Sequence, residues 1–144
     1  MEDNYLIEGP VTSGIISSFL ERMAQKKDSG GHSFFLGQVR NDEVNGKRVR
    51  AIEYSAYENM VKAEADKIRE FVFSEFDDVN TIFIIHSTGI VKTGEVSLAV
   101  MVSAGHRKQA MQACTMTVEL IKERLPVWKK EIYEDNSHTW RENE

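Results

Sequence analysis

The sequence predicts an α+β fold, in which three helices pack on a largely antiparallel sheet. Apolar residues recur at helical spacing in three separate stretches. Segments rich in β-branched and aromatic residues lie between these stretches, mostly as adjacent pairs that short turns can join into antiparallel hairpins. The regular alternation of one strand with one helix, which a doubly wound parallel sheet requires, is absent.

The N-terminal stretch is expected to form a short strand and the first helix. Tyr5–Glu8 alternates weakly between apolar and polar residues and ends at Gly9-Pro10. Thr12 or Ser13 can cap the helix that follows. This helix should end near Lys27, because a run of turn-forming residues comes next.

A β-hairpin and the second helix are expected after that turn. Ser33–Arg40 is rich in aromatic and β-branched residues, and Asn45-Gly46 is the strongest hairpin signal in the chain. Val49–Tyr57 alternates as the return strand. The apolar stripe from Met60 to Phe76 then predicts a helix of about five turns.

The remaining elements are two strands, the third helix and a closing hairpin. Thr81–His86 and Glu95–Ala104 are predicted strands on either side of a glycine turn. A helix should run from about His106 to Arg124, where the proline that follows ends it. Val127–Tyr133 is a predicted strand, and Thr139–Arg141 can pair back onto it.

Composition excludes several classes of protein. The chain has 144 residues, of which 41% are hydrophobic, enough for one domain over residues 1–144 with its own core. Its apolar runs are far shorter than the ~20 residues that span a bilayer, and no secretory signal pattern opens it. The single cysteine, Cys114, excludes a disulfide framework and lies on the apolar stripe of the third helix. We therefore expect a cytoplasmic protein in which Cys114 is structural.

Motifs for metal, nucleotide and nucleic-acid binding are missing as well. The four histidines have no spacing that places two on one helical face, and neither glycine-rich phosphate loop occurs. We expect no metal and no cofactor. The net charge of −5 disfavours binding to nucleic acid.

One segment of this acidic chain is basic. Between His106 and Lys130 there are six Lys or Arg residues and two acidic residues, whereas Glu131 to Glu144 contains five acids and one arginine. A local excess of positive charge in an acidic protein favours a small anionic ligand over a polyanion. A solvated helix face is the simpler interpretation, and the charge count alone does not separate the two.

Three groups of basic residues are candidates for such an anion site. His106 and Arg107 follow a glycine at the start of the third helix, where free amides and the helix dipole attract anions, although a solvated surface pair is also an option. Lys122 and Lys129 can meet only if the strand after the proline folds back against the helix, and two close ammonium groups depress at least one pKa. A lysine near a helix C-terminus also interacts favourably with the helix dipole, and this structural role explains the position of Lys122 as well as an anion site does. Arg40, at the end of a strand, is the third candidate.

Five blocks of sequence form a recognisable set, and residues 122–131, KERLPVWKKE, are the most specific of them. The other blocks are residues 35–40, 53–57, 86–89 with 94–95, and 105–107. In this order, and over most of the chain from about Gly31 to Arg141, the set resembles the MoaE family, the large catalytic subunits of molybdopterin synthase.

The resemblance implies an α/β-hammerhead fold and a sulfurtransferase of molybdenum-cofactor biosynthesis. Such an enzyme takes sulfur from the C-terminal Gly-Gly thiocarboxylate of a small ubiquitin-like carrier subunit. It transfers the sulfur to cyclic pyranopterin monophosphate, and two transfers form the dithiolene of molybdopterin. A homodimer within a heterotetramer is implied too, with no role for nucleic acid or a membrane.

The resemblance also assigns roles to residues. Lys122 matches the family's essential lysine and Lys129 its second active-site lysine, so both are candidate catalytic residues. Both lysines are also expected to bind the anionic substrate, together with Gln38, Val39, Arg40, His106, Arg107, Lys130 and Glu131. The competing interpretation is a non-catalytic module whose basic segment binds an anion or the tail of a partner. A stand-alone hydrolase lacks a nucleophile or a carboxylate pair and ranks last.

Overall fold

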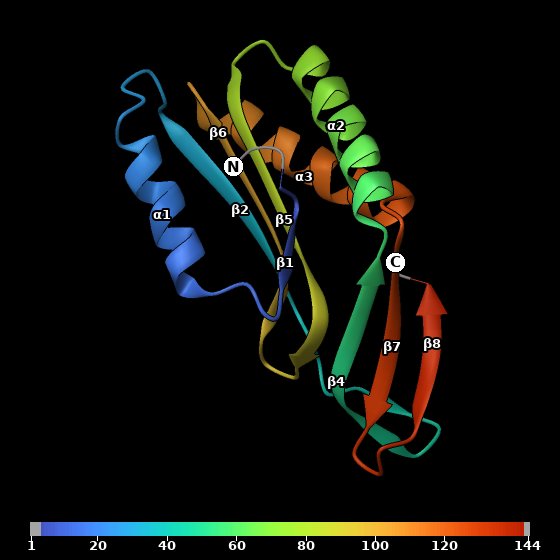
Figure 1. The fold of residues 1–144 in the computed structure, drawn as a ribbon. Coiled ribbons are helices and arrows are strands. Elements are labelled where there is room, and N and C mark those ends of the chain that lie inside the picture. Colours follow the sequence, from blue (N-terminus) through green and yellow to red (C-terminus); the bar gives the residue numbers. More distant parts are fainter. Residues whose placement is uncertain (1–3, 143–144) are drawn as a thin grey trace.

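The computed structural model describes residues 4–142, which contain three helices and eight strands (Figure 1). The helices are α1 (Ser13–Met23), α2 (Glu58–Glu75) and α3 (Arg107–Arg124). The strands are β1 (Leu6–Glu8), β2 (Gly31–Gln38), β3 (Glu43–Val44), β4 (Lys47–Ala56), β5 (Val79–Lys92), β6 (Val96–Ala104), β7 (Val127–Tyr133) and β8 (His138–Glu142).

The strands form a largely antiparallel sheet, so the α+β prediction is confirmed. Its main path is β2-β6-β5-β4-β7-β8, with β3 paired to β4 and β1 paired in parallel to β5. The long strand β5 pairs with β6 along its first part and with β4 near its end. It therefore joins the helix-covered part of the sheet to a distal sheet of β4, β7 and β8, which Figure 1 shows below α2.

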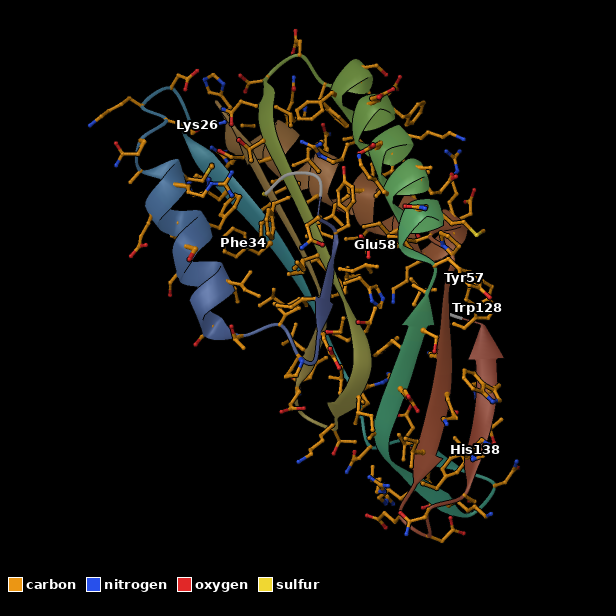
Figure 2. The ribbon with its side chains drawn as sticks, viewed as in Figure 1. Lys26, Phe34, Tyr57, Glu58, Trp128 and His138 are labelled. Atoms are coloured by element: carbon orange, nitrogen blue, oxygen red, sulfur yellow. The ribbon has the colours of Figure 1, made fainter. Side chains whose placement is uncertain are left out.

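The core lies on both faces of the helix-covered sheet. Along β6, Leu98 and Val100 pack in the cluster that holds the buried residues of α2 and α3, whereas Ala99 and Met101 pack in the cluster of α1. Alternate residues of a strand point to opposite faces, so α1 covers one face and the other two helices cover the opposite face. Figure 2 shows Phe34 of β2 on the α1 side, where its ring meets Phe19 edge-on, with 5.4 Å between centroids.

The prediction that Ser33–Arg40 pairs with the strand after Asn45-Gly46 is wrong, although the predicted turn at Asn45-Gly46 is present. Asn45 and Gly46 have φ angles of 52° and 79° and form a tight turn, as Asn-Gly favours. That turn joins β4 to the two-residue strand β3, and the predicted strand over Ser33–Arg40 instead pairs as β2 with β6. A turn fixes the register only of the residues beside it. β2 has apolar residues on both faces, so it buries more of them beside β6, in which every residue after Val96 is buried.

The first helix is shorter than predicted. It ends at Met23 rather than near Lys27, because the amides of Gln25 and Lys26 donate to carbonyls three residues back and tighten the chain into turns. The strand predicted over Thr81–His86 is longer than expected, since β5 continues to Lys92, whereas the other boundaries lie close to the predictions and β7 has the predicted bounds. No helix within residues 4–142 is both long and apolar enough to cross a lipid bilayer.

Candidate active site

The C-terminal end of α3 brings two lysines together. Lys122 lies in the last turn of α3, which ends at Arg124 with Leu125 as its C-cap, and the chain then turns back as β7. This return places Lys129 of β7 opposite Tyr54 of β4 in the distal sheet. Burial, and then the charge of Lys129, lower the pKa of Lys122 from its ordinary value. The strand thus folds back toward the end of α3, and the charge of Lys129 acts on Lys122.

A buried histidine and a buried tyrosine lie beside this lysine pair. The His86 ring packs edge-on against Tyr54, with 5.0 Å between centroids, and its Nδ1 lies 2.8 Å from the Ser87 carbonyl oxygen. Burial lowers the pKa of His86 to about 4, and the charge of Lys122 adds to that decrease. His86 is therefore neutral at physiological pH, with the proton on Nδ1 donated to Ser87.

The surroundings of Lys122 suit proton transfer beside an anion. A lysine of lowered pKa has a larger neutral fraction near neutral pH, so it can accept a proton or return one. Because His86 is neutral, it adds no positive charge next to Lys122. The ammonium group of Lys129 is a second positive charge near Lys122, and it would stabilise negative charge that develops on a substrate beside the two lysines.

The other end of α3 holds His106 and Arg107, far from the lysine pair. Fifteen residues separate Arg107 from Lys122, so their Cα atoms lie about 22 Å apart along the helix. His106 is the N-cap residue of α3, and its backbone N–H donates to Asp78 Oδ2 at 2.8 Å. The anion site predicted at this helix start is thus partly filled by the protein's own carboxylate, which also compensates the cation beside the helix dipole.

The segment 38–40 lies at the end of β2. Gln38 pairs with Val96 at the start of β6, and the buried Val39 donates its N–H to the Glu95 carbonyl at 3.0 Å. Arg40 has 80% of its side chain exposed, and its guanidinium pairs with Asp42 at 3.3 Å. Of these three, Arg40 alone offers a charged group to a ligand.

Lys130 and Glu131 occupy opposite faces of β7. Lys130 points away from the face of Lys129, because neighbouring residues of a strand alternate. Its Nζ lies 3.1 Å from Glu53 Oε1 and over the Trp140 ring, 5.3 Å from the centroid. Figure 2 shows Trp128, two residues before Lys130, beside Tyr57. Glu131 shares the face of Lys129, but it is buried and accepts a hydrogen bond from Arg141 Nε.

Cys114 is buried on α3, and its thiol lies 3.9 Å from the Val100 carbonyl oxygen. Burial raises the pKa of this thiol, which disfavours the thiolate that a nucleophile requires. The structural role predicted for it fits these surroundings. Within residues 4–142, no three His, Cys, Asp or Glu residues are grouped to hold a metal ion.

Two polar residues near the candidate groups had no role in the sequence prediction. His86 stands alone in an apolar strand, and that pattern signals a buried, neutral imidazole. Asp78 is one of two adjacent aspartates in the loop between α2 and β5, and its bond to His106, 28 residues later, has no signal in the sequence.

The comparisons with known proteins agree with the fold. A family model described as MoaE protein matches residues 13–124, which include Lys122 and stop before Lys129. A molybdopterin synthase catalytic subunit of Dictyostelium discoideum is 39% identical over 124 residues, covering 85% of this chain and 78% of that protein. One of Drosophila pseudoobscura pseudoobscura is 42% identical over 79% of this chain, which spans only 32% of that longer relative.

Solved structures of molybdopterin synthase and of a molybdopterin-converting factor have a similar fold. Molybdopterin synthase from Staphylococcus aureus superposes with a TM-score of 0.82 at 26% identity, over 98% of both chains. A complex of subunits 1 and 2 of molybdopterin-converting factor from Helicobacter pylori contains a chain with a TM-score of 0.78 at 21% identity, over 94% of this chain and 87% of that one.

Proposed function

The chain belongs to the MoaE protein family, and we propose that it is the catalytic subunit of a molybdopterin synthase. The proposed reaction transfers sulfur from the C-terminal thiocarboxylate of a small ubiquitin-like carrier subunit to cyclic pyranopterin monophosphate, forming the dithiolene of molybdopterin. The observation that carries this proposal is the half-buried Lys122, whose pKa is lowered by burial and by Lys129.

The chemistry asked of this chain is binding and proton transfer. Sulfur arrives on the carrier, so the absence of an activated thiol at Cys114 is no objection. Lys122 accepts and returns protons as oxygen on the substrate is replaced by sulfur. Lys129 stabilises the negative charge of the incoming tail and of the reacting centre. The exposed guanidiniums of Arg40 and Arg107 are suited to the phosphate of the substrate.

A second copy of the chain completes the proposed site. A small substrate cannot bridge the ~22 Å between Arg107 and Lys122 of one α3 helix. A twofold axis near the middle of α3 would bring the partner's Arg107 close to Lys122. An apolar groove of about 700 Å³ lies between α2 and this part of α3, and Met111 beside it is 56% exposed. These features support a homodimer, which the carrier subunits would extend to a heterotetramer.

The test is reconstitution with thiocarboxylated carrier and cyclic pyranopterin monophosphate. We expect the protein to convert the precursor to the dithiolene, and we expect no conversion without the carrier. A binding module would retain the carrier or the precursor and form no dithiolene, and that result would overturn the proposal. The cytoplasm is the proposed compartment, supported by a single cysteine that has no disulfide partner in the chain.

A further inference from the structure

We propose that Asp78 is a positioning residue that holds the His106 imidazole in one orientation and one tautomer, with Nε2 directed outward. The inference rests on the proposed function only where it treats His106 as a substrate-binding group. The arrangement of the two side chains can be tested without the reaction.

Two hydrogen bonds join the residues at a single carboxylate oxygen. The backbone N–H of His106 donates to Asp78 Oδ2 at 2.8 Å, and the ring Nδ1 lies 3.0 Å from the same oxygen. The His106 side chain is 88% exposed, whereas that of Asp78 is 30% exposed. The ring thus stands in solvent while one of its nitrogens is tied to a more sheltered carboxylate.

The backbone of Asp78 is itself held by two hydrogen bonds. The backbone N–H of Asp78 donates to Gln109 Oε1 at 2.9 Å, and its carbonyl accepts from the Gly105 N–H at 3.1 Å. A Cβ atom at residue 105 would collide with the Asp78 carboxylate, so only glycine leaves room for this contact. Gln109 also donates from Nε2 to Asp77 Oδ1 at 3.0 Å, which fixes the loop before β5 against the first turn of α3.

The tautomer follows from the chemistry of the pair. An ionised carboxylate can only accept hydrogen bonds, so the Nδ1 that faces Asp78 carries a proton. In the neutral ring Nε2 is then an acceptor, and in the protonated ring it is a donor. Either way Nε2 is the atom presented to a ligand, and Nδ1 is not available for binding.

Fixing the exposed His106 ring lowers the entropic cost of binding a ligand at a site formed by two chains. A free surface histidine samples several rotamers, and a ligand would have to select one of them at an entropic cost. His106 is already oriented, so this cost is met before the ligand arrives. That property is suited to a residue presented to the site of a second chain.

The experiment compares Asp78→Asn with its matched control Asp77→Asn. Both remove one negative charge from the same loop, but Asp77 bonds Gln109 and not His106. Nitrogen-15 spectra of the histidine rings, recorded at a pH where His106 is neutral, identify the nitrogen that carries the proton. We expect Nδ1–H in the wild type and in Asp77→Asn. We expect a shift toward Nε2–H in Asp78→Asn, because the amide oxygen that still accepts from the His106 N–H is neutral and accepts from Nδ1 more weakly than a carboxylate does.

Turnover in the reconstituted assay adds a second readout. Asp78→Asn should lower kcat/KM about 10-fold, the factor that corresponds to one ordinary hydrogen bond. In a His106→Ala background the same change should have no further effect, because Asp78 acts through the ring. Gly105→Ala should reproduce the Asp78→Asn spectrum.

The outcomes are separable. An Nε2–H ring in the wild type, or an equal loss of activity from Asp78→Asn with and without His106, would overturn the positioning role. The second result would make Asp78 only a cap for α3. Wild-type protein that shows the expected Nδ1–H ring and its change in Asp78→Asn, but forms no dithiolene, would support the positioning and contradict the proposed function.

Discussion

The two ends of α3 carry basic residues in opposite surroundings. Lys122, at the C-terminal end, is half-buried beside the neutral His86, and its pKa is lowered. His106, at the N-terminal end, is exposed and is tied to Asp78. The helix dipole favours a cation at the first of these ends and disfavours one at the second, where Asp78 compensates it.

This difference indicates a division of labour along one helix. A lysine whose charge is disfavoured by burial is suited to moving protons, whereas exposed cations that are held in place are suited to being presented to another molecule. The two functions cannot meet on a small substrate within one chain, because about 22 Å of helix separates them. The proposed dimer resolves this separation.

The largest effect is expected from Lys122→Ala. This change should lower turnover by about 10²- to 10⁴-fold, the contribution typical of a positioned acid or base. The fold should persist, because the substitution removes a charge that burial disfavours. The checks are the rate in the reconstituted assay, the circular dichroism spectrum and the elution volume. Lys67→Ala, which removes an exposed lysine of α2, is the control. Turnover like that of the wild type would remove Lys122 from the mechanism.

Arg107→Ala is expected to act next most strongly, and on binding. Losing charge-assisted hydrogen bonds to a phosphate should weaken precursor binding by about 10- to 100-fold. Binding of the carrier should change much less. Calorimetric titration with each ligand measures both affinities, and Lys108→Ala removes one charge from the same helix end as a control. Equal loss of both affinities, or of neither, is incompatible with a role at the substrate phosphate.

Lys129→Gln tests the electrostatics at the C-terminal end. Removing a like charge favours the protonated form of Lys122, so the pKa of Lys122 should rise toward its ordinary value. The rise should be partial, because burial is the larger cause of the decrease and remains. Carbon-13 titration of the lysine Cε signals measures this change directly. The limb of the pH-rate profile that reports neutral Lys122 should move to higher pH. An unchanged or lower pKa would mean that the two ammonium groups do not interact.

The smallest effect is expected from Lys130→Met, the neighbour of Lys129 on the opposite face of β7. Turnover should stay within about 2-fold, although the resemblance includes Lys130 among the substrate-binding residues. The free energy of unfolding should fall by about 1 kcal/mol or less, since the contacts with Glu53 and Trp140 are partly exposed to solvent and each is weak. Urea unfolding and the reconstituted assay measure the two quantities. A loss of turnover as large as that of Lys129→Gln would show that Lys130 reaches the substrate.

The sequence predicts most of the local structure because local chemistry determines it. Pro126 ends α3 and begins β7 where predicted, and Asn45-Gly46 makes the predicted turn. The partner of β2 was predicted wrongly, because strand pairing depends on burial against distant residues and not on the nearest turn.

In the candidate site, too, the features set by local sequence could be expected, and those set by contacts between distant elements could not. The sequence allows a Lys122–Lys129 pair, because the proline between them ends the helix, but the return of the strand depends on packing that spacing does not show. The distance from this pair to His106 follows from the length of the helix between them. The roles of His86 and Asp78 depend on contacts between elements far apart in the sequence, which no local pattern encodes.

Mixing two impaired variants, assayed at a precursor concentration well below the wild-type KM, tests most directly whether both ends of α3 serve one site across a dimer. Lys122→Ala and Arg107→Ala chains are unfolded together, refolded in equal amounts and assayed. Each mixed dimer would then contain one site with both residues intact. Random pairing should restore about a quarter of the wild-type activity, since half of the dimers are mixed and each has one of its two sites intact. If both residues act within a single chain, no intact site forms, and activity no higher than that of the two variants assayed separately would contradict the account.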